Sequence, residues 1–182
     1  MKIVSTSILA ALAMSMASGA SAQHAHEHGV AELRVALEGS TLLVEFESPL
    51  ANLVGFEHAA RSEAEKAALA GLEKTLRAPA GLFALPAAAG CALKEVELEL
   101  PGVEDDHHHH GHDHKHDHKH AHHDDHADAY VAWEFACKSA PEALDLTVIE
   151  AFPAIHVLRV ETAGPRGQKA SRVEQAKARI AL

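Results

Sequence analysis

The sequence predicts an α+β domain: mainly antiparallel β-sheet, one principal helix at about residues 61–78, and a long disordered histidine-rich loop between two strands. Three observations predict it. Apolar and polar residues alternate with period two in several short segments, as they do in half-buried strands. One segment has helical spacing instead, and residues 104–127 are a low-complexity stretch rich in histidine. Strands segregated from a single long helix are typical of the α+β class.

The N-terminus has the features of a signal peptide spanning residues 1–22. Lys2 precedes an apolar segment from Ile8 to Met16, and the small residues Ala20 and Ala22 fit a cleavage site. The apolar segment is shorter than the roughly 20 residues that cross a bilayer. A buried N-terminal helix is the alternative. We expect secretion of one domain, residues 23–182, without membrane insertion.

Residues 30–49 are predicted to form a β-hairpin with its turn at residues 38–40. Pro49 ends its second strand. The apolar positions spaced for the strand faces are Val30, Leu33, Val35, Leu37, Leu43 and Phe46.

The principal helix has a capping box, because Ser62 stands three residues before Glu65. Pro79 ends it, and residues 79–90 form a turn-rich connector. Its apolar stripe consists of Ala67, Leu69, Leu72 and Leu76.

Two alternating segments, residues 91–100 and 129–139, flank the histidine-rich loop and are predicted to pair antiparallel. The loop is then an enlarged hairpin connection. Further strands are expected within residues 144–153 and 155–163. Residues 169–182 predict one or two short strands, although the alanines there also tolerate a helix.

Two cysteines, Cys91 and Cys137, are predicted to form a disulfide, since a secreted chain matures in an oxidising compartment. Such a bridge would clamp the loop at its base. The alternative is a pair of thiolate metal ligands, which no CxxC spacing supports.

The histidine-rich insert (residues 104–127) is predicted to capture metal ions. Neutral imidazole is the commonest protein ligand for divalent transition metals. A terminal tag or a solvated linker is the alternative, but this run is internal and mixed with aspartate. Binding should weaken as the pH falls through about 6.5, where imidazole gains a proton. Twelve of the 17 histidines lie here, namely His107, His108, His109, His110, His112, His114, His116, His118, His120, His122, His123 and His126.

Three more histidines, His24, His26 and His28, alternate near the mature N-terminus and could chelate together. A solvated, frayed terminus is the alternative for them. His58 is isolated and lies just before the principal helix. His156 lies in an apolar strand segment, where packing is the simpler interpretation.

The metal is expected to be Zn(II), Ni(II) or Cu(II). All three methionines fall within residues 1–22, so the secreted chain has no thioether for Cu(I). A net charge of −10 leaves no basic face for nucleic acid. An enzyme is not expected, because there is no HExxH motif and a low-complexity loop cannot fix reacting groups. Glu57 beside His58 is the one tempting base for a zinc hydrolase.

Two segments, "HEHGVAEL" and "PLANLVGFEHAARSEAEKAAL", together with the insert, resemble the ZrgA-type family of zinc-regulated periplasmic zinc-uptake proteins. The resemblance implies a periplasmic Zn(II)-binding protein that helps to supply a zinc ABC transporter or its periplasmic binding protein. The array of imidazoles in the insert is expected to load several ions at once. His26 and His28 match the first motif, and Glu57 with His58 matches the second. An ordered site near His24, His26, His28 and His58 is therefore expected beside the insert.

Overall fold

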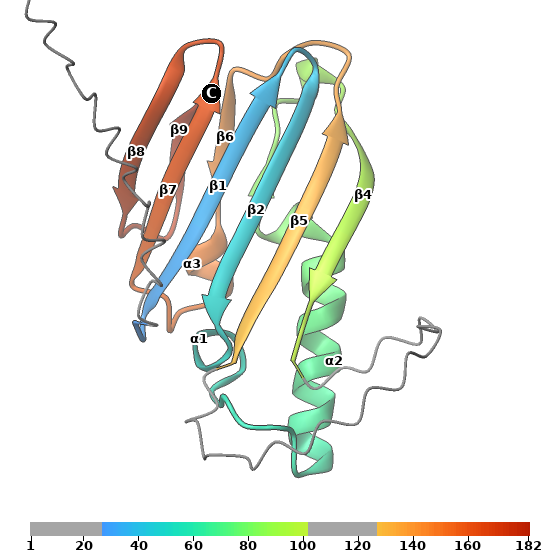
Figure 1. Ribbon diagram of the computed structural model, residues 1–182, viewed down its shortest axis with the longest axis vertical. Coiled ribbons are helices and arrows are strands. Elements are labelled where there is room, and N and C mark those ends of the chain that lie inside the picture. Colours follow the sequence, from blue (N-terminus) through green and yellow to red (C-terminus); the bar gives the residue numbers. More distant parts are fainter. Residues whose placement is uncertain (1–26, 102–126) are drawn as a thin grey trace, which may run out of the picture.

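The computed structural model describes residues 27–101 and 127–182 (Figure 1). The predicted signal peptide, His24, His26 and the twelve histidines of the insert lie outside these residues, as does the predicted disorder of the insert. The described residues are mostly β-sheet with three α-helices, of which one is long, in agreement with the predicted α+β class.

The main sheet has six strands in the order β4-β5-β2-β1-β7-β8. Neighbouring strands run antiparallel except β1 and β7, which pair in parallel, and this parallel pair was not predicted. The strands are β1 (Val30–Glu38), β2 (Thr41–Pro49), β4 (Ala92–Glu99), β5 (Asp128–Ala136), β7 (Val157–Gly164) and β8 (Gly167–Val173).

A second sheet of three short strands, in the order β3-β6-β9, was also not predicted. Its members are β3 (Phe83–Ala84), β6 (Ala143–Leu146) and β9 (Ala178–Ala181). The helices are α1 (Leu50–Val54), α2 (Glu63–Arg77) and α3 (Val148–Ala151), with short 3₁₀ turns η1 (Pro79–Gly81) and η2 (Ala87–Ala89). The second sheet, α2 and α3 lie on one face of the main sheet, and α1 lies at the end of the sheet where β2 finishes (Figure 1).

The hydrophobic core lies between the main sheet and α2. The helix buries Leu69, Leu72 and Leu76, and Trp133 of β5 donates its indole N–H to the carbonyl of Leu76 at 2.6 Å. Each such fully buried apolar side chain contributes roughly 1.5–3 kcal/mol. This packing fixes the helix, and with it the loop that precedes the helix, against the sheet.

The predicted capping box at the start of α2 is confirmed, with Ser62 and Glu65 exchanging side-chain to backbone hydrogen bonds. The predicted apolar stripe is wrong at one position, because Ala67 is exposed. Ala67 lies two residues before Leu69, and a helix turns by about 200° over that distance.

Two strand predictions need correction. Leu43 and Phe46 occupy opposite faces of β2, and the buried face carries Leu42, Val44 and Phe46. The segment 144–153 is only partly a strand, since β6 ends at Leu146 and α3 follows. In the segment 169–182 the two short strands are confirmed, and the helix alternative is wrong.

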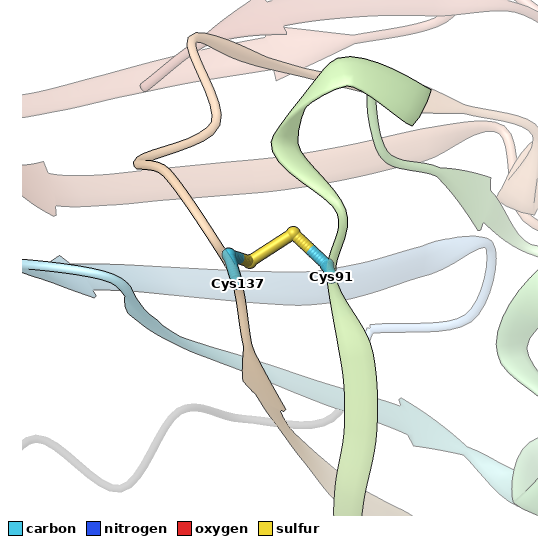
Figure 2. The surroundings of a disulfide bond; sticks show 2 residues. All are labelled: Cys91 and Cys137. Atoms are coloured by element: carbon cyan, nitrogen blue, oxygen red, sulfur yellow. A yellow bond between two sulfur atoms is a disulfide. The ribbon is translucent and has the colours of Figure 1, made fainter.

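The predicted disulfide between Cys91 and Cys137 is confirmed, but it does not clamp the insert at its base (Figure 2). Cys91 precedes β4 and Cys137 follows β5, whereas the insert joins the end of β4 to the start of β5. The bridge therefore closes the strand pair at the end of the sheet opposite to the insert. Near the insert, the Leu50 amide donates to the carbonyl of Ala127 at 2.8 Å instead.

Candidate metal centre

Every histidine-bearing segment of the chain joins the main sheet at the same end. Strands β1, β5 and β7 begin at this end, and β2 and β4 finish there. His24, His26 and His28 precede β1, His58 follows β2 and α1, the insert separates β4 from β5, and His156 immediately precedes β7. We call this the histidine end.

The opposite end carries the disulfide and the tight turns, and we call it the disulfide end. Residues 39–40, 137–142 and 165–166, which connect the strands there, contain no histidine. The amide of Cys137 donates to the carbonyl of Ser40 at 2.9 Å, which ties the bridge to the β1–β2 turn. The antiparallel topology thus segregates the imidazoles from the crosslink.

His28 lies in a tight turn that leads into β1. The Val30 amide donates to the Glu27 carbonyl at 3.0 Å, and Gly29 takes a φ of 80°, in the left-handed region that favours glycine. A Cβ at Gly29 would also lie 3.1 Å from the ring of His156. The glycine of the "HEHG" motif is therefore required by this turn.

The His28 ring faces the Glu57 carboxylate, which lies in the segment after α1. His28 Nε2 is 3.7 Å from Glu57 Oε1, with the histidine 67% exposed and the glutamate 18% exposed. Two tetrahedral zinc ligands at the usual bond lengths lie about 3.4 Å apart. The two atoms are therefore close to the separation that a shared zinc ion requires, and the exposed ring leaves the pair open to an arriving ion.

His58 forms a second histidine–carboxylate pair. Its Nδ1 is 3.0 Å from the Ala59 carbonyl, which can only accept, so this hydrogen bond places the proton on Nδ1. The tautomer leaves Nε2 available to a metal, as in many histidine ligands. The ring stacks on Phe56 with centroids 5.2 Å apart, and its Nε2 is 3.9 Å from Glu65 Oε1.

Glu65 was predicted only as a helix cap, yet it also faces His58. Its Oε2 accepts hydrogen bonds from the amides of Arg61 at 2.6 Å and Ser62 at 2.9 Å. The bond from Arg61, followed by the bond from Ser62, lowers the pKa of Glu65 below its ordinary value. The ionised carboxylate thus keeps its other oxygen directed at His58. No sequence signal separates this role from capping.

The structure brings the predicted residues together in pairs rather than in one closed site. Among residues 27–101 and 127–182, no group of three or more histidine, cysteine, aspartate or glutamate side chains is arranged to hold a metal ion. His28 and His58 each meet one carboxylate. The predicted partners His24 and His26 lie outside the described residues, so the four-histidine site stays a prediction.

His156 is not packed in the core, contrary to expectation. Its side chain is exposed, and its backbone amide donates to the Gly29 carbonyl at 2.8 Å. The chain between α3 and β7 curves over the turn that carries His28, so the backbone of His156 makes the hydrogen bond while its ring lies beside Gly29. The apolar neighbours Ile155 and Val157 are buried in its place.

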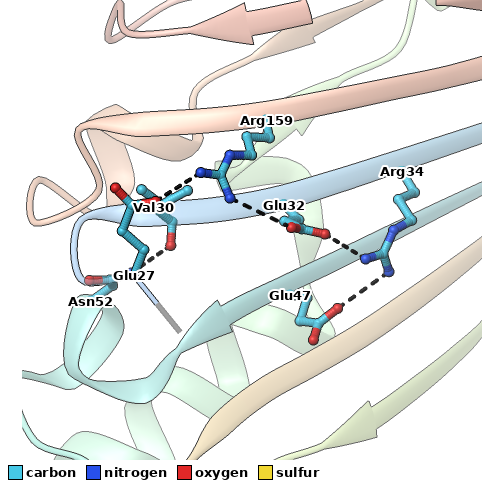
Figure 3. Close-up of polar contacts among 7 residues, drawn as sticks. All are labelled: Glu27, Val30, Glu32, Arg34, Glu47, Asn52 and Arg159. Carbon is cyan, nitrogen blue, oxygen red and sulfur yellow. Dashed lines mark hydrogen bonds and ion pairs between the residues drawn. The ribbon is translucent and has the colours of Figure 1, made fainter. Parts of the chain in front are cut away.

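A row of ion pairs crosses the outer face of the sheet beside this turn (Figure 3). Arg159 on β7 binds Glu27 at 2.8 Å and approaches Glu32 at 4.0 Å. Arg34 joins Glu32 to Glu47. Surface pairs of this kind add little stability each. Glu27, the glutamate of the "HEH" motif, therefore pairs with Arg159 and not with His28. The His28 ring faces Glu57 instead.

The sheet face that leads into the insert is acidic. Burial, followed by the Glu45 carboxylate and then Glu97 and Glu99, raises the pKa of Tyr130 to about 12. Glu97 and Glu99 lie on β4, which runs directly into the insert. This negative surface favours the accumulation of cations at the histidine end.

A family model described as "ZrgA family zinc uptake protein" matches residues 25–182. No curated protein matches the chain. Within the part of the chain that the structure describes, none of the helices is long and apolar enough to cross a membrane.

Proposed function

Because the chain belongs to the ZrgA family of zinc uptake proteins, we propose that it captures and buffers Zn(II) in the periplasm. It does so without catalysing a reaction. Its zinc passes to a zinc ABC importer or to the periplasmic binding protein of that importer. The signal peptide expected in residues 1–22 and the disulfide support an oxidising, extracytoplasmic compartment.

The observation that carries this proposal is the placement of all histidine-bearing segments at the histidine end. It supports two layers of binding. The insert offers twelve imidazoles and takes up several ions. The ordered layer lies near His24, His26, His28 and His58 and includes the carboxylates of Glu57 and Glu65. The hydrogen bond from the Leu50 amide to the Ala127 carbonyl joins the end of the insert to the start of α1. Glu57 lies three residues after the end of this helix.

Zinc suits the available donor atoms. Imidazole nitrogen and carboxylate oxygen are ordinary zinc ligands, and both cysteines are held in the disulfide rather than free as thiolates. The same donors also suit nickel and copper(II), so a nickel or copper(II) buffer is the alternative function. The family supports zinc, and the metal content of protein purified from cells grown in defined medium would separate the three ions.

Calorimetric titration with zinc tests the two layers. The wild-type chain is compared with a variant in which all twelve insert histidines become glutamine, which keeps the length of the insert. We expect the stoichiometry to fall from several ions to about one, with the tighter phase retained. Loss of all zinc binding in this variant would show that no ordered layer exists.

A further inference from the structure

The buried side chain of Asn52 lies between the two segments that carry the His28–Glu57 pair. Asn52 belongs to α1 and is 5% exposed, and with Ser48 it makes up the buried polar side chains of the described residues. Burying an amide is unfavourable unless its hydrogen bonds are satisfied. The partners of Asn52 therefore indicate what the residue does.

Asn52 uses both ends of its amide on the turn that follows His28. The Gly29 amide donates to Asn52 Oδ1 at 2.8 Å. Asn52 Nδ2 donates to the Val30 carbonyl at 2.9 Å (Figure 3). Asn52 Nδ2 also donates to Ser48 Oγ at 3.2 Å. One partner is a donor and the other an acceptor, and the side-chain amide satisfies both because it carries an acceptor oxygen and a donor nitrogen. Aspartate would keep the first bond and lose the second.

Gly29 is held from its other side as well. Its carbonyl accepts from the amides of His156 at 2.8 Å and Val157 at 3.0 Å. The peptide groups that flank Gly29 are thus fixed between α1 and the start of β7. His28, one residue earlier, has little backbone freedom left.

The same side chain fixes Glu57 relative to His28. Helix α1 ends at Val54 and is capped by Gly55, which has a φ of 86°, and Glu57 lies two residues after this cap. A link between α1 and Gly29 therefore joins the segment that bears the carboxylate to the segment that bears the imidazole. Without these hydrogen bonds, no side chain of α1 would hold the segment that bears Glu57 to the turn that bears His28.

We propose that Asn52 is a positioning residue for zinc, holding His28 and Glu57 near the separation that one ion requires. The inference rests on the proposed zinc function. Residues that orient metal ligands without touching the metal typically change affinity by roughly tenfold to a hundredfold when they are replaced. A purely structural residue would change stability and leave zinc affinity at His28 unaltered.

The test follows the imidazole signals of His28 by NMR during zinc titration of the full secreted chain. Asn52→Ala removes the contacts to Gly29 and Val30. The control is Trp133→Phe, which removes a buried hydrogen bond to Leu76 far from the turn. We expect the zinc concentration that half-saturates His28 to rise roughly tenfold to a hundredfold in Asn52→Ala. It should stay within about twofold of wild type in Trp133→Phe, because distant sites act independently.

Two results would overturn the inference. One is a folded Asn52→Ala protein whose His28 fills at the wild-type zinc concentration. The other is an equal weakening in Trp133→Phe, which would assign the effect to general stability. If His28 of the wild type does not respond to zinc at all, the proposed ordered layer fails, and the inference fails with it.

A second measurement on the wild type decides the matter if Asn52→Ala does not fold. Coupling is reciprocal, so a hydrogen bond that favours zinc binding must itself be favoured by bound zinc. Hydrogen exchange at the Gly29 amide should therefore slow when His28 is loaded. Unchanged exchange in a protein whose His28 has bound zinc would contradict the positioning role.

Discussion

The two ends of the main sheet differ in chemistry, although the same strands run between them. The histidine end gathers the imidazoles that precede β1, follow β2 and precede β7, together with the insert. The disulfide end holds the Cys91–Cys137 bridge and the tight β1–β2 turn. The difference teaches that the covalent crosslink and the proposed metal site are separated by the length of a strand. Each end can therefore be changed without the other.

The largest expected effect is at the disulfide end. Replacing both cysteines, Cys91→Ala with Cys137→Ala, frees a crosslink across a sequence separation of 46, worth about 4 kcal/mol of unfolding free energy in the chain-entropy model. Urea unfolding measures this loss, and zinc titration of the folded variant should match the wild type. A change in zinc affinity at His28 would contradict the proposed independence of the two ends.

Glu57→Gln should produce the reverse effect at the histidine end. Replacing the carboxylate that faces His28 by a neutral amide is expected to weaken zinc binding at His28 about tenfold. The urea midpoint should change little. Glu38→Gln is the matched control, since it removes the same charge from an exposed position at the disulfide end. Equal weakening in both variants would point to net charge rather than ligation.

Glu65 should link stability to zinc binding, because it caps α2 and also faces His58. Glu65→Gln retains the capping geometry but removes the charge, so zinc binding at His58 should weaken severalfold while thermal stability is nearly kept. Glu65→Ala should weaken zinc binding at His58 and also lower thermal stability, because the side chain that caps α2 is removed. A Glu65→Gln protein with wild-type affinity at His58 would exclude the second pair from the metal centre.

The lowered pKa of Glu65 also predicts the effect of acid. A carboxyl whose folded pKa is depressed contributes stability above its ordinary value of 4.5 and loses it as the pH falls through the lower, folded value. Thermal unfolding of the metal-free wild type should thus lose stability below pH 4.5 more steeply than that of Glu65→Gln. Parallel pH profiles would contradict the capping assignment.

The smallest effect is expected for His156→Ala. The backbone of His156, not its ring, binds Gly29, so zinc affinity at His28 should stay within about twofold of wild type. A loss of tenfold or more in the same titration would make His156 a ligand.

The sequence predicted the elements whose signals are local. Alternation located the β1–β2 hairpin and the β4–β5 pair, and the Ser62 to Glu65 spacing located the start of α2. It did not predict the parallel pairing of β1 with β7, which joins residues more than 100 positions apart and leaves no periodic signal. The grouping of β6 and β9 with β3 into a second sheet was missed for the same reason, and β3 itself, with two residues, is too short for a periodic signal.

In the candidate site, too, local sequence signals identified some residues, and contacts between distant segments identified the others. Residue type alone selected His28 and His58, and the family motif added Glu57. The role of Glu65, the position of His156 and the contacts of Asn52 depend on how distant segments meet, so they required the structure. The base clamp was wrong because Cys91 begins the first flanking strand and Cys137 ends the second, so an antiparallel pair joined by the insert places both cysteines at the opposite end.

The most direct test of a metal centre confined to the histidine end is a zinc titration of the uniformly ¹⁵N-labelled chain of residues 23–182. We expect the first zinc-dependent amide shifts at residues 27–29 and 55–62, while residues 39–40, 137–142 and 165–167 stay unchanged. First shifts at the disulfide end, or no shifts at residues 27–29 and 55–62 while zinc binds elsewhere, would contradict this account.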